Sequence, residues 1–234
     1  MIRKSKFNHS NKRFDFNLEK VLTLGMFIRI NPDKINQSEI DKVVKCLREG
    51  GIVIYPTDSV YAIGCDLQNQ KGIEKICSLK KIKPEKAHFT FICSDLSHLS
   101  EFTKPISNSI FKIIKRATPG PYTFILEANS NVPKLVKHNK KTIGIRIPDN
   151  TICNALITTL GHPILSSSLH DSEDEIRDYF SDPEIIRERY EGIVDLIIAG
   201  DHGNLIPTSI IDFTGDEIKI VREGLGDVSW VRTN

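Results

Sequence analysis

The feature that most constrains the fold is a regular alternation of helical and strand-like segments along the chain. Apolar residues recur at helical spacing from Ile40 to Leu47, a Gly50–Gly51 pair ends that segment, and the β-branched run Ile52–Tyr55 follows at once. Further helices are expected at residues 70–80, 107–115 and 150–160, and further strands at 88–93, 122–128, 142–147, 164–168, 194–199, 208–213 and 218–222. Strands interleaved with helices form a sheet that helices cover, and the late strands, which lack helical crossovers, favour antiparallel pairing. The pattern predicts an α/β fold with a twisted, mixed parallel and antiparallel sheet and helices on its faces.

The length of 234 residues favours one domain, which we place at residues 26–234. The hydrophobic share is 39% and the charged share 26%, and no apolar run approaches the roughly 20 residues that span a bilayer, so no membrane role is expected. Residues 1–25 are basic and lack both periodicity and the apolar core of a secretory signal, so we expect a disordered arm that folding does not need. Either Met1 or Met26 fits as the natural start.

Cysteine and histidine usage points away from disulfides and metals. Five cysteines are dispersed along the chain, and none forms a Cys-x-x-Cys pair. This favours reduced thiols that pack in the core of a cytoplasmic protein. The seven histidines do not cluster at ligand spacings, so no zinc site is expected.

Charge is segregated along the chain, although the formal net charge is only +2. Residues 134–146 contain five basic residues and no acid, whereas residues 171–201 contain eleven acids and three arginines. Such segregation favours a basic face toward an anionic partner over a uniformly solvated surface. We expect the segments Lys134–Lys141 and Lys80–Lys86 to contact the phosphates of RNA.

Polar side chains gather where the predicted strands end, which is where open α/β sheets bind their ligands. Thr57 lies in a polar run directly after the strand Ile52–Tyr55, and the triplet Ser166–Ser168 ends another strand. Arg146 ends an apolar strand, and a charged group there needs a carboxylate or a ligand as its partner. The glycine-rich motifs of Rossmann and P-loop nucleotide sites are absent. The pattern therefore predicts a different cavity, lined by Lys, Arg and Ser/Thr, for an anionic, nucleotide-like ligand.

Seven segments of the chain occur in the order typical of one known family. They are Tyr55–Tyr61, Lys81–Pro84, Thr118–Leu126, Gly144–Pro148, Ser166–Ser168, Pro207–Asp212 and Val221–Gly224. Over residues 26–226 the chain resembles the YrdC/YciO superfamily of threonylcarbamoyl-AMP synthases, and residues 87–93 and 222–227 look more similar to its YciO branch. The resemblance implies a twisted α/β sheet around a large basic cavity.

The resemblance also implies an activity and a set of site residues. The family makes threonylcarbamoyl-AMP from L-threonine, bicarbonate and ATP, for the modification of an adenosine in tRNA. Thr57 and Arg146 are then expected to hold the threonine and the acyl intermediate. The nucleotide site is expected to comprise Lys81, Lys83, Ser168, His170, Ser209 and Arg222. Because bicarbonate and ATP are anions, cations, hydroxyl groups and Mg2+ are expected to act, and no side chain is assigned as a catalytic nucleophile.

Two of these positions depart from the synthase pattern. Lys83 stands where synthases carry arginine, and lysine lacks the fork that binds phosphate at two points. His170 stands where they carry asparagine. These departures favour an alternative, a YciO-like protein that binds double-stranded RNA or tRNA with weak or no synthase activity, whereas Thr57 and Arg146 favour the enzyme. An unrelated nucleotide-dependent reaction in the same cavity is the third hypothesis.

Overall fold

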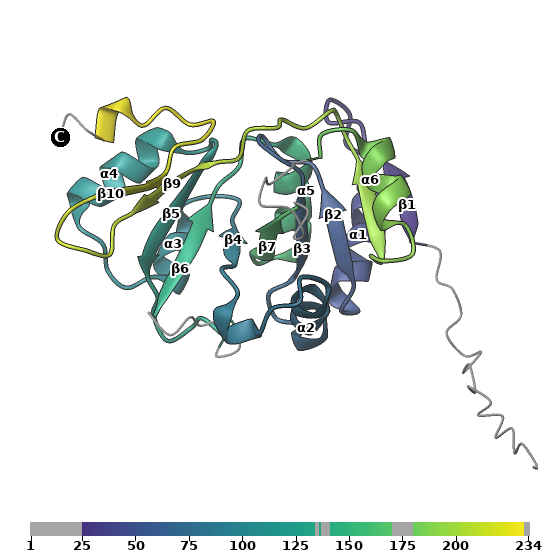
Figure 1. Ribbon diagram of the computed structural model, residues 1–234, viewed down its shortest axis with the longest axis horizontal. Coiled ribbons are helices and arrows are strands. Elements are labelled where there is room, and N and C mark those ends of the chain that lie inside the picture. Colours follow the sequence, from purple (N-terminus) through teal and green to yellow (C-terminus); the bar gives the residue numbers. More distant parts are fainter. Residues whose placement is uncertain (1–24, 134–135, 137–140, 170–179, 232–234) are drawn as a thin grey trace, which may run out of the picture.

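Ten strands form one sheet that runs across the molecule, from β1 at one end to β10 at the other (Figure 1). The structure is a computed structural model that describes residues 25–133, 136, 141–169 and 180–231. The strands are β1 (Met26–Arg29), β2 (Ile52–Tyr55), β3 (Ala62–Asp66), β4 (Thr90–Ile92), β5 (Tyr122–Glu127), β6 (Thr142–Arg146), β7 (Ile164–Ser168), β8 (Leu196–Ala199), β9 (Ser209–Asp212) and β10 (Lys219–Arg222). The helices are α1 (Gln37–Arg48), α2 (Gln70–Leu79), α3 (Ser97–Phe102), α4 (Asn108–Ala117), α5 (Thr151–Leu160) and α6 (Pro183–Tyr190), with short 3₁₀ turns η1 (Pro84–Lys86) and η2 (Ser229–Val231).

The sheet is mixed, as the sequence predicts. Its order is β1-β8-β2-β3-β7-β4-β6-β5-β9-β10. β8 pairs in parallel with β1 and β2, β4 with β6, and β5 with β9, and the remaining neighbours are antiparallel. The α/β prediction is confirmed, and each predicted helix and strand exists within a few residues of its expected limits. The predictions missed β1, β3, α3 and α6, which are short or lie in polar sequence.

Local sequence explains where the helices begin and which faces they bury. In α1 the side chain of Asn36 accepts a hydrogen bond from the Ser38 N–H and caps the helix. The four apolar residues at helical spacing, Ile40, Val43, Val44 and Leu47, are all buried. α5 begins in the same way, with Asn150 accepting from the Cys153 N–H, and ends at Gly161 with a φ of 89°. These two helices therefore present apolar faces to the sheet.

The two faces of the sheet are covered unequally. On one face, α1 and α5 pack on residues of β2, β3, β7, β8 and the end of β4. Among the described residues, none from β5, β6, β9 or β10 belongs to that cluster. The other face carries a larger core, in which α2 and side chains from α3, α4 and α6 pack on the sheet. The far half of the first face thus lies outside this cluster and carries both polar and apolar side chains, among them Thr123 and Ile125, and this half positions the candidate site.

The described residues contain no helix long and apolar enough to cross a membrane. All five cysteines are free thiols, and four of them are buried, which confirms their predicted place in the core.

Candidate ligand-binding site

Arg146 ends β6 in a buried polar cluster with the loop that follows β2. Its Nη2 donates to the hydroxyl oxygens of Thr57 at 3.0 Å and Ser59 at 2.8 Å, and it forms an ion pair with Asp58. The side chains of Arg146 and Asp58 are only 7% and 10% exposed. The sequence predicts that Arg146 needs a carboxylate or a ligand as its partner, and in the structure that partner is the carboxylate of Asp58, in the polar run after β2.

The Thr57 hydroxyl is fully used inside this loop. It donates to the Val60 carbonyl at 2.7 Å, and it accepts from the Ser59 N–H at 3.1 Å as well as from Arg146. A hydroxyl has one donor and two acceptor positions, so little capacity is left for a ligand. Thr57 therefore holds the position of Arg146, and its predicted contact with threonine stays a prediction.

Arg146 retains a donor that the fold does not satisfy. Its Nε is buried and has no hydrogen-bond partner among the described residues. Buried N–H groups are nearly always hydrogen-bonded, so the unpaired Nε–H of Arg146 is a donor that could bind the oxygen of a ligand.

A second cluster surrounds Arg222, two strands from β5. The Arg222 Nε donates to the Thr208 carbonyl at 2.9 Å, and its Nη2 donates to the Thr208 hydroxyl at 3.1 Å. That hydroxyl lies 2.9 Å from the Thr123 hydroxyl. Ser209 is fully buried, and its hydroxyl donates to the Gly226 carbonyl at 2.5 Å and accepts from the Gly224 N–H at 2.9 Å. Ser209 thus fixes the loop after β10.

Strand register places the two arginines on the same face of the sheet. Ile145 pairs with Phe124, which brings Arg146 level with Thr123, and Thr123 pairs with Ile210. A register shift in β10 between Ile220 and Arg222 then places Arg222, rather than Val221, opposite Ile210. Paired residues share a face, so Arg146 and Arg222 lie on the same face of the sheet. Their backbone positions are separated by three strand spacings, about 14 Å. We call this line of residues the Arg146–Arg222 row. It crosses the half of the sheet that α1 and α5 leave uncovered.

The predicted lysines lie at the end of α2, near the end of β7. The Lys80 Nζ donates to the Ser168 carbonyl at 3.1 Å, which brings the lysine loop beside Ser168. Lys81 and Lys83 are exposed, and Lys81 has a left-handed backbone with a φ of 53°. The predicted residue His170 and most of the predicted basic segment Lys134–Lys141 lie outside the described residues.

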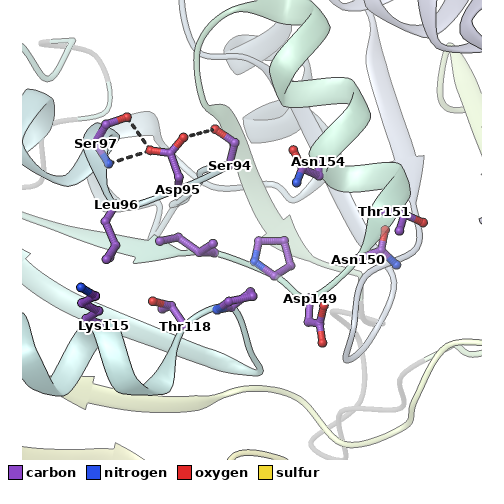
Figure 2. Close-up of a pocket in the computed structure, with 13 residues that line it drawn as sticks. Ser94, Asp95, Leu96, Ser97, Lys115, Thr118, Asp149, Asn150, Thr151 and Asn154 are labelled. Carbon is purple, nitrogen blue, oxygen red and sulfur yellow. Dashed lines mark hydrogen bonds between the residues drawn. The ribbon is translucent and has the colours of Figure 1, made fainter.

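Two cavities lie close to these groups. The larger one, about 560 Å³, is formed by the loop after β4, the end of α4 and the start of α5 (Figure 2). Asp95 accepts hydrogen bonds from Ser94 and Ser97 (Figure 2). The bonds from Ser97 are the main cause of the lowered pKa of Asp95. The smaller cavity, about 140 Å³, lies on the uncovered face and includes Thr90, Thr123 and Gly144 in its wall. Neither wall includes a predicted site residue or is strongly basic, so the basic cavity stays a prediction.

No activated nucleophile accompanies the Arg146 cluster. The Cys153 Sγ lies 3.2 Å from the Pro56 carbonyl oxygen directly beside this loop, and burial raises the pKa of the thiol to about 12. The described residues also contain no group of three or more His, Cys, Asp or Glu side chains that could hold a metal ion.

The fold and these clusters define an α/β protein whose mixed sheet carries two arginines on one face, with a carboxylate against one of them. Comparison with known proteins narrows this class. The profile of the family described as "Telomere recombination", which covers Sua5, YciO and YrdC, matches residues 45–224. The chain belongs to the Sua5/YciO/YrdC family.

Individual relatives agree with this assignment. The chain is 43% identical to the Escherichia coli K12 protein YciO over 206 residues, which cover 88% of this chain and 98% of YciO. It is 31% identical to the threonylcarbamoyl-AMP synthase of Coxiella burnetii RSA 493, over 80% of this chain and all of that protein. The crystal structure of E. coli YciO matches with a TM-score of 0.81 over 88% of this chain and 98% of that one. The structure of P. abyssi Sua5 with L-threonine has the same fold, with a TM-score of 0.78 at 23% identity, over 85% of this chain and 57% of that one.

Proposed function

We propose that this protein is a threonylcarbamoyl-AMP synthase that joins L-threonine, bicarbonate and ATP. The observation that carries the proposal is the Arg146 cluster, in which a buried guanidinium keeps one N–H unpaired among the described residues. A carboxylate is the natural acceptor for such a group. The synthase name of the Coxiella burnetii relative supports this proposal.

The reaction requires positioned reactants and charge stabilisation. The threonine amine attacks bicarbonate to form a carbamate with loss of water, and a carbamate oxygen then attacks the α-phosphate of ATP and expels pyrophosphate. Arg146 would bind the threonine carboxylate, and Arg222, with Lys81 and Lys83, would attract the phosphates. The backbone positions of the two arginines are three strand spacings apart along one face, about 14 Å. Orientation alone can contribute about 7–11 kcal/mol to such a reaction.

Pyrophosphate release that depends on both L-threonine and bicarbonate tests the proposal. We expect pyrophosphate release to stop when either L-threonine or bicarbonate is omitted. In Arg222→Met the rate of release should fall at least about tenfold, which corresponds to a rise of roughly 1.4 kcal/mol in the activation free energy. ATP hydrolysis that ignores threonine and bicarbonate would contradict it.

A second candidate function is RNA binding, alone or for delivery of the product. The exposure of Lys81, Lys83 and Lys86 on one short segment favours it. Exposed lysines contact backbone phosphates without reading sequence. We expect the protein to shift labelled double-stranded RNA in a gel-shift assay, with little preference among RNA sequences. No shift even at low salt would remove this candidate.

A further inference from the structure

The larger cavity lies where two neighbouring parallel strands end (Figure 2). β4 and β6 pair in parallel, so their carboxyl ends meet at the same edge of the sheet. The chain leaves β4 for α3, which packs in the larger core, and leaves β6 for α5, which packs on the opposite face. In open α/β sheets, ligands bind in the crevice between connections that leave adjacent strands in opposite directions. The volume of about 560 Å³ is also within the range of roughly 300–1,000 Å³ that is usual for small-molecule sites.

Charged side chains of both signs line this cavity, and two of them are unpaired. Figure 2 shows Lys115 on one side, at the end of α4, and Asp149 on the other side, before α5. Within the parts of the chain that the structure describes, neither the Lys115 ammonium group nor the Asp149 carboxylate has a hydrogen-bond or ion-pair partner. Asp95, the other carboxylate in the wall, already accepts three hydrogen bonds from Ser94 and Ser97. Lys115 and Asp149 are therefore the charged groups with the most capacity for a ligand.

The remaining wall supplies further donors and an apolar surface. The side-chain oxygen of Asn150 accepts from the Cys153 N–H, and that of Asn154 accepts from the Thr158 hydroxyl. The amide NH2 groups of both asparagines remain as donors, since an amide carries two N–H bonds besides its oxygen. The wall also contains four apolar side chains, those of Leu96, Pro119, Ile147 and Pro148.

This combination matches an uncharged ring compound with hydroxyl groups. Asp95 and Asp149 repel a phosphate or a carboxylate, and the unpaired Lys115 repels an amine. Neighbouring hydroxyls can donate to a carboxylate, as ribose hydroxyls do in dinucleotide sites. Ring nitrogens and oxygens can accept from an ammonium or amide group, and apolar side chains pack against the ring itself. A nucleoside has all of these features.

We propose that this cavity binds a nucleoside, with the ribose diol held by Asp149 and the base accepting a hydrogen bond from Lys115. The cavity wall contains none of the residues to which the synthase reaction is attributed above. The inference therefore goes beyond the proposed function and does not depend on it.

The first test is equilibrium dialysis of the unaltered protein against labelled adenosine and, separately, labelled 2′-deoxyadenosine. The two probes differ by one hydroxyl of the diol, so a carboxylate that holds the diol discriminates between them. We expect adenosine to bind with a Kd of about 1 mM or lower, and 2′-deoxyadenosine to bind at least about tenfold more weakly. Absence of adenosine binding, or equal affinity for the two nucleosides, would overturn the inference.

The second test removes the carboxylate with Asp149→Ala. The affinity for adenosine should fall at least about tenfold, and the preference over 2′-deoxyadenosine should disappear. The control is Asp216→Ala, which changes the net charge equally at an exposed residue between β9 and β10 and should leave both quantities unchanged. Unchanged adenosine binding in Asp149→Ala would mean that the nucleoside binds elsewhere, and would refute the proposal.

The third test fills the cavity and decides the question if Asp149→Ala does not fold. Asn154 is exposed on α5 in the cavity wall, so tryptophan at this position should occupy the space of the ligand. The matched control is Asn108→Trp, at an exposed asparagine at the opposite end of α4 from Lys115. We expect Asn154→Trp to abolish adenosine binding and Asn108→Trp to retain it. Retained binding in Asn154→Trp, or equal loss in both variants, would contradict the proposed site.

Discussion

Replacing Arg146 by methionine tests how firmly the buried ion pair is built into the fold. The side chains of Arg146 and Asp58 are 7% and 10% exposed, so water screens the pair only weakly. Methionine fills similar space but leaves the Asp58 carboxylate without its cation. Removing one partner of a buried pair costs about 3–5 kcal/mol, because the remaining charge stays uncompensated. We expect Arg146→Met to lower the free energy of unfolding by that amount.

A double-mutant cycle isolates the interaction itself. Asp58→Leu alone should also destabilise, because it leaves Arg146 unpaired, whereas the double variant Arg146→Met with Asp58→Leu leaves no buried charge. The double variant should therefore cost less than the sum of the single variants, by about 2 kcal/mol. Urea unfolding followed by the fluorescence of Trp230, the single tryptophan, which packs against Tyr122, gives each value. The denaturant slope should stay constant across the series.

The exposed pair of Lys104 and Glu127 is the matched control. Its Nζ and Oε2 atoms lie 2.8 Å apart, but the two side chains are 54% and 51% exposed. Exposed pairs contribute about 0–1 kcal/mol, so Lys104→Met should change stability little. If Arg146→Met cost no more than Lys104→Met, and the cycle were additive, the Arg146 cluster would be a loosely solvated pair and the reasoning would be wrong.

Other predictions follow from single positions. Lys81→Gly should raise the free energy of unfolding by about 1 kcal/mol, because the backbone of Lys81 has a φ of 53°, which is unfavourable for residues other than glycine. The control Lys83→Gly, at a φ of −77°, should not stabilise the protein, and urea unfolding measures both variants. Burial raises the pKa of Cys46 from 9.0 to about 11, so the unfolded thiol ionises first and stability should fall as pH rises from 9 to 11, less steeply in Cys46→Ser. Lys83→Arg with His170→Asn should raise threonine-dependent pyrophosphate release about tenfold or more, since arginine restores the two-point phosphate contact. RNA affinity should fall steeply between about 50 and 200 mM salt, and a flat salt dependence would argue against phosphate contacts.

Sequence patterns predicted most of the elements because those depend on local periodicity and caps. The apolar spacing from Ile40 to Leu47 predicted α1, and the run Ile52–Tyr55 predicted β2, both of which the structure confirms. β3 was not predicted because it begins at Ala62, directly after a polar segment that is typical of a loop. α6 was missed because its acidic surroundings resembled a solvated segment, although Ile186 buries one face of it.

Part of the candidate site was also accessible from sequence. A charged residue at the end of an apolar strand predicted a partner for Arg146, and the polar run around Thr57 lay in the same family motif. The ligand contact of Thr57 stays a prediction, and the structure adds that its hydroxyl already bonds with Val60, Ser59 and Arg146. A hydroxyl's partners depend on its exact surroundings, which sequence spacing does not describe.

The sequence by itself determined the helices, the strands and the need for a charge partner, because these follow from periodicity and from the cost of burying an unpaired ion. Only the tertiary structure decided which partner Arg146 takes and which residues share its face. Arg222 is 76 positions further along the chain, yet the register of β6, β5, β9 and β10 places both arginines in one row. The pairing of β9 with β10 includes a register shift between Ile220 and Arg222, and this shift places Arg222 opposite Ile210 and so on this face. Register is a property of the packed sheet, in which each strand is aligned by the side chains it buries against its neighbours.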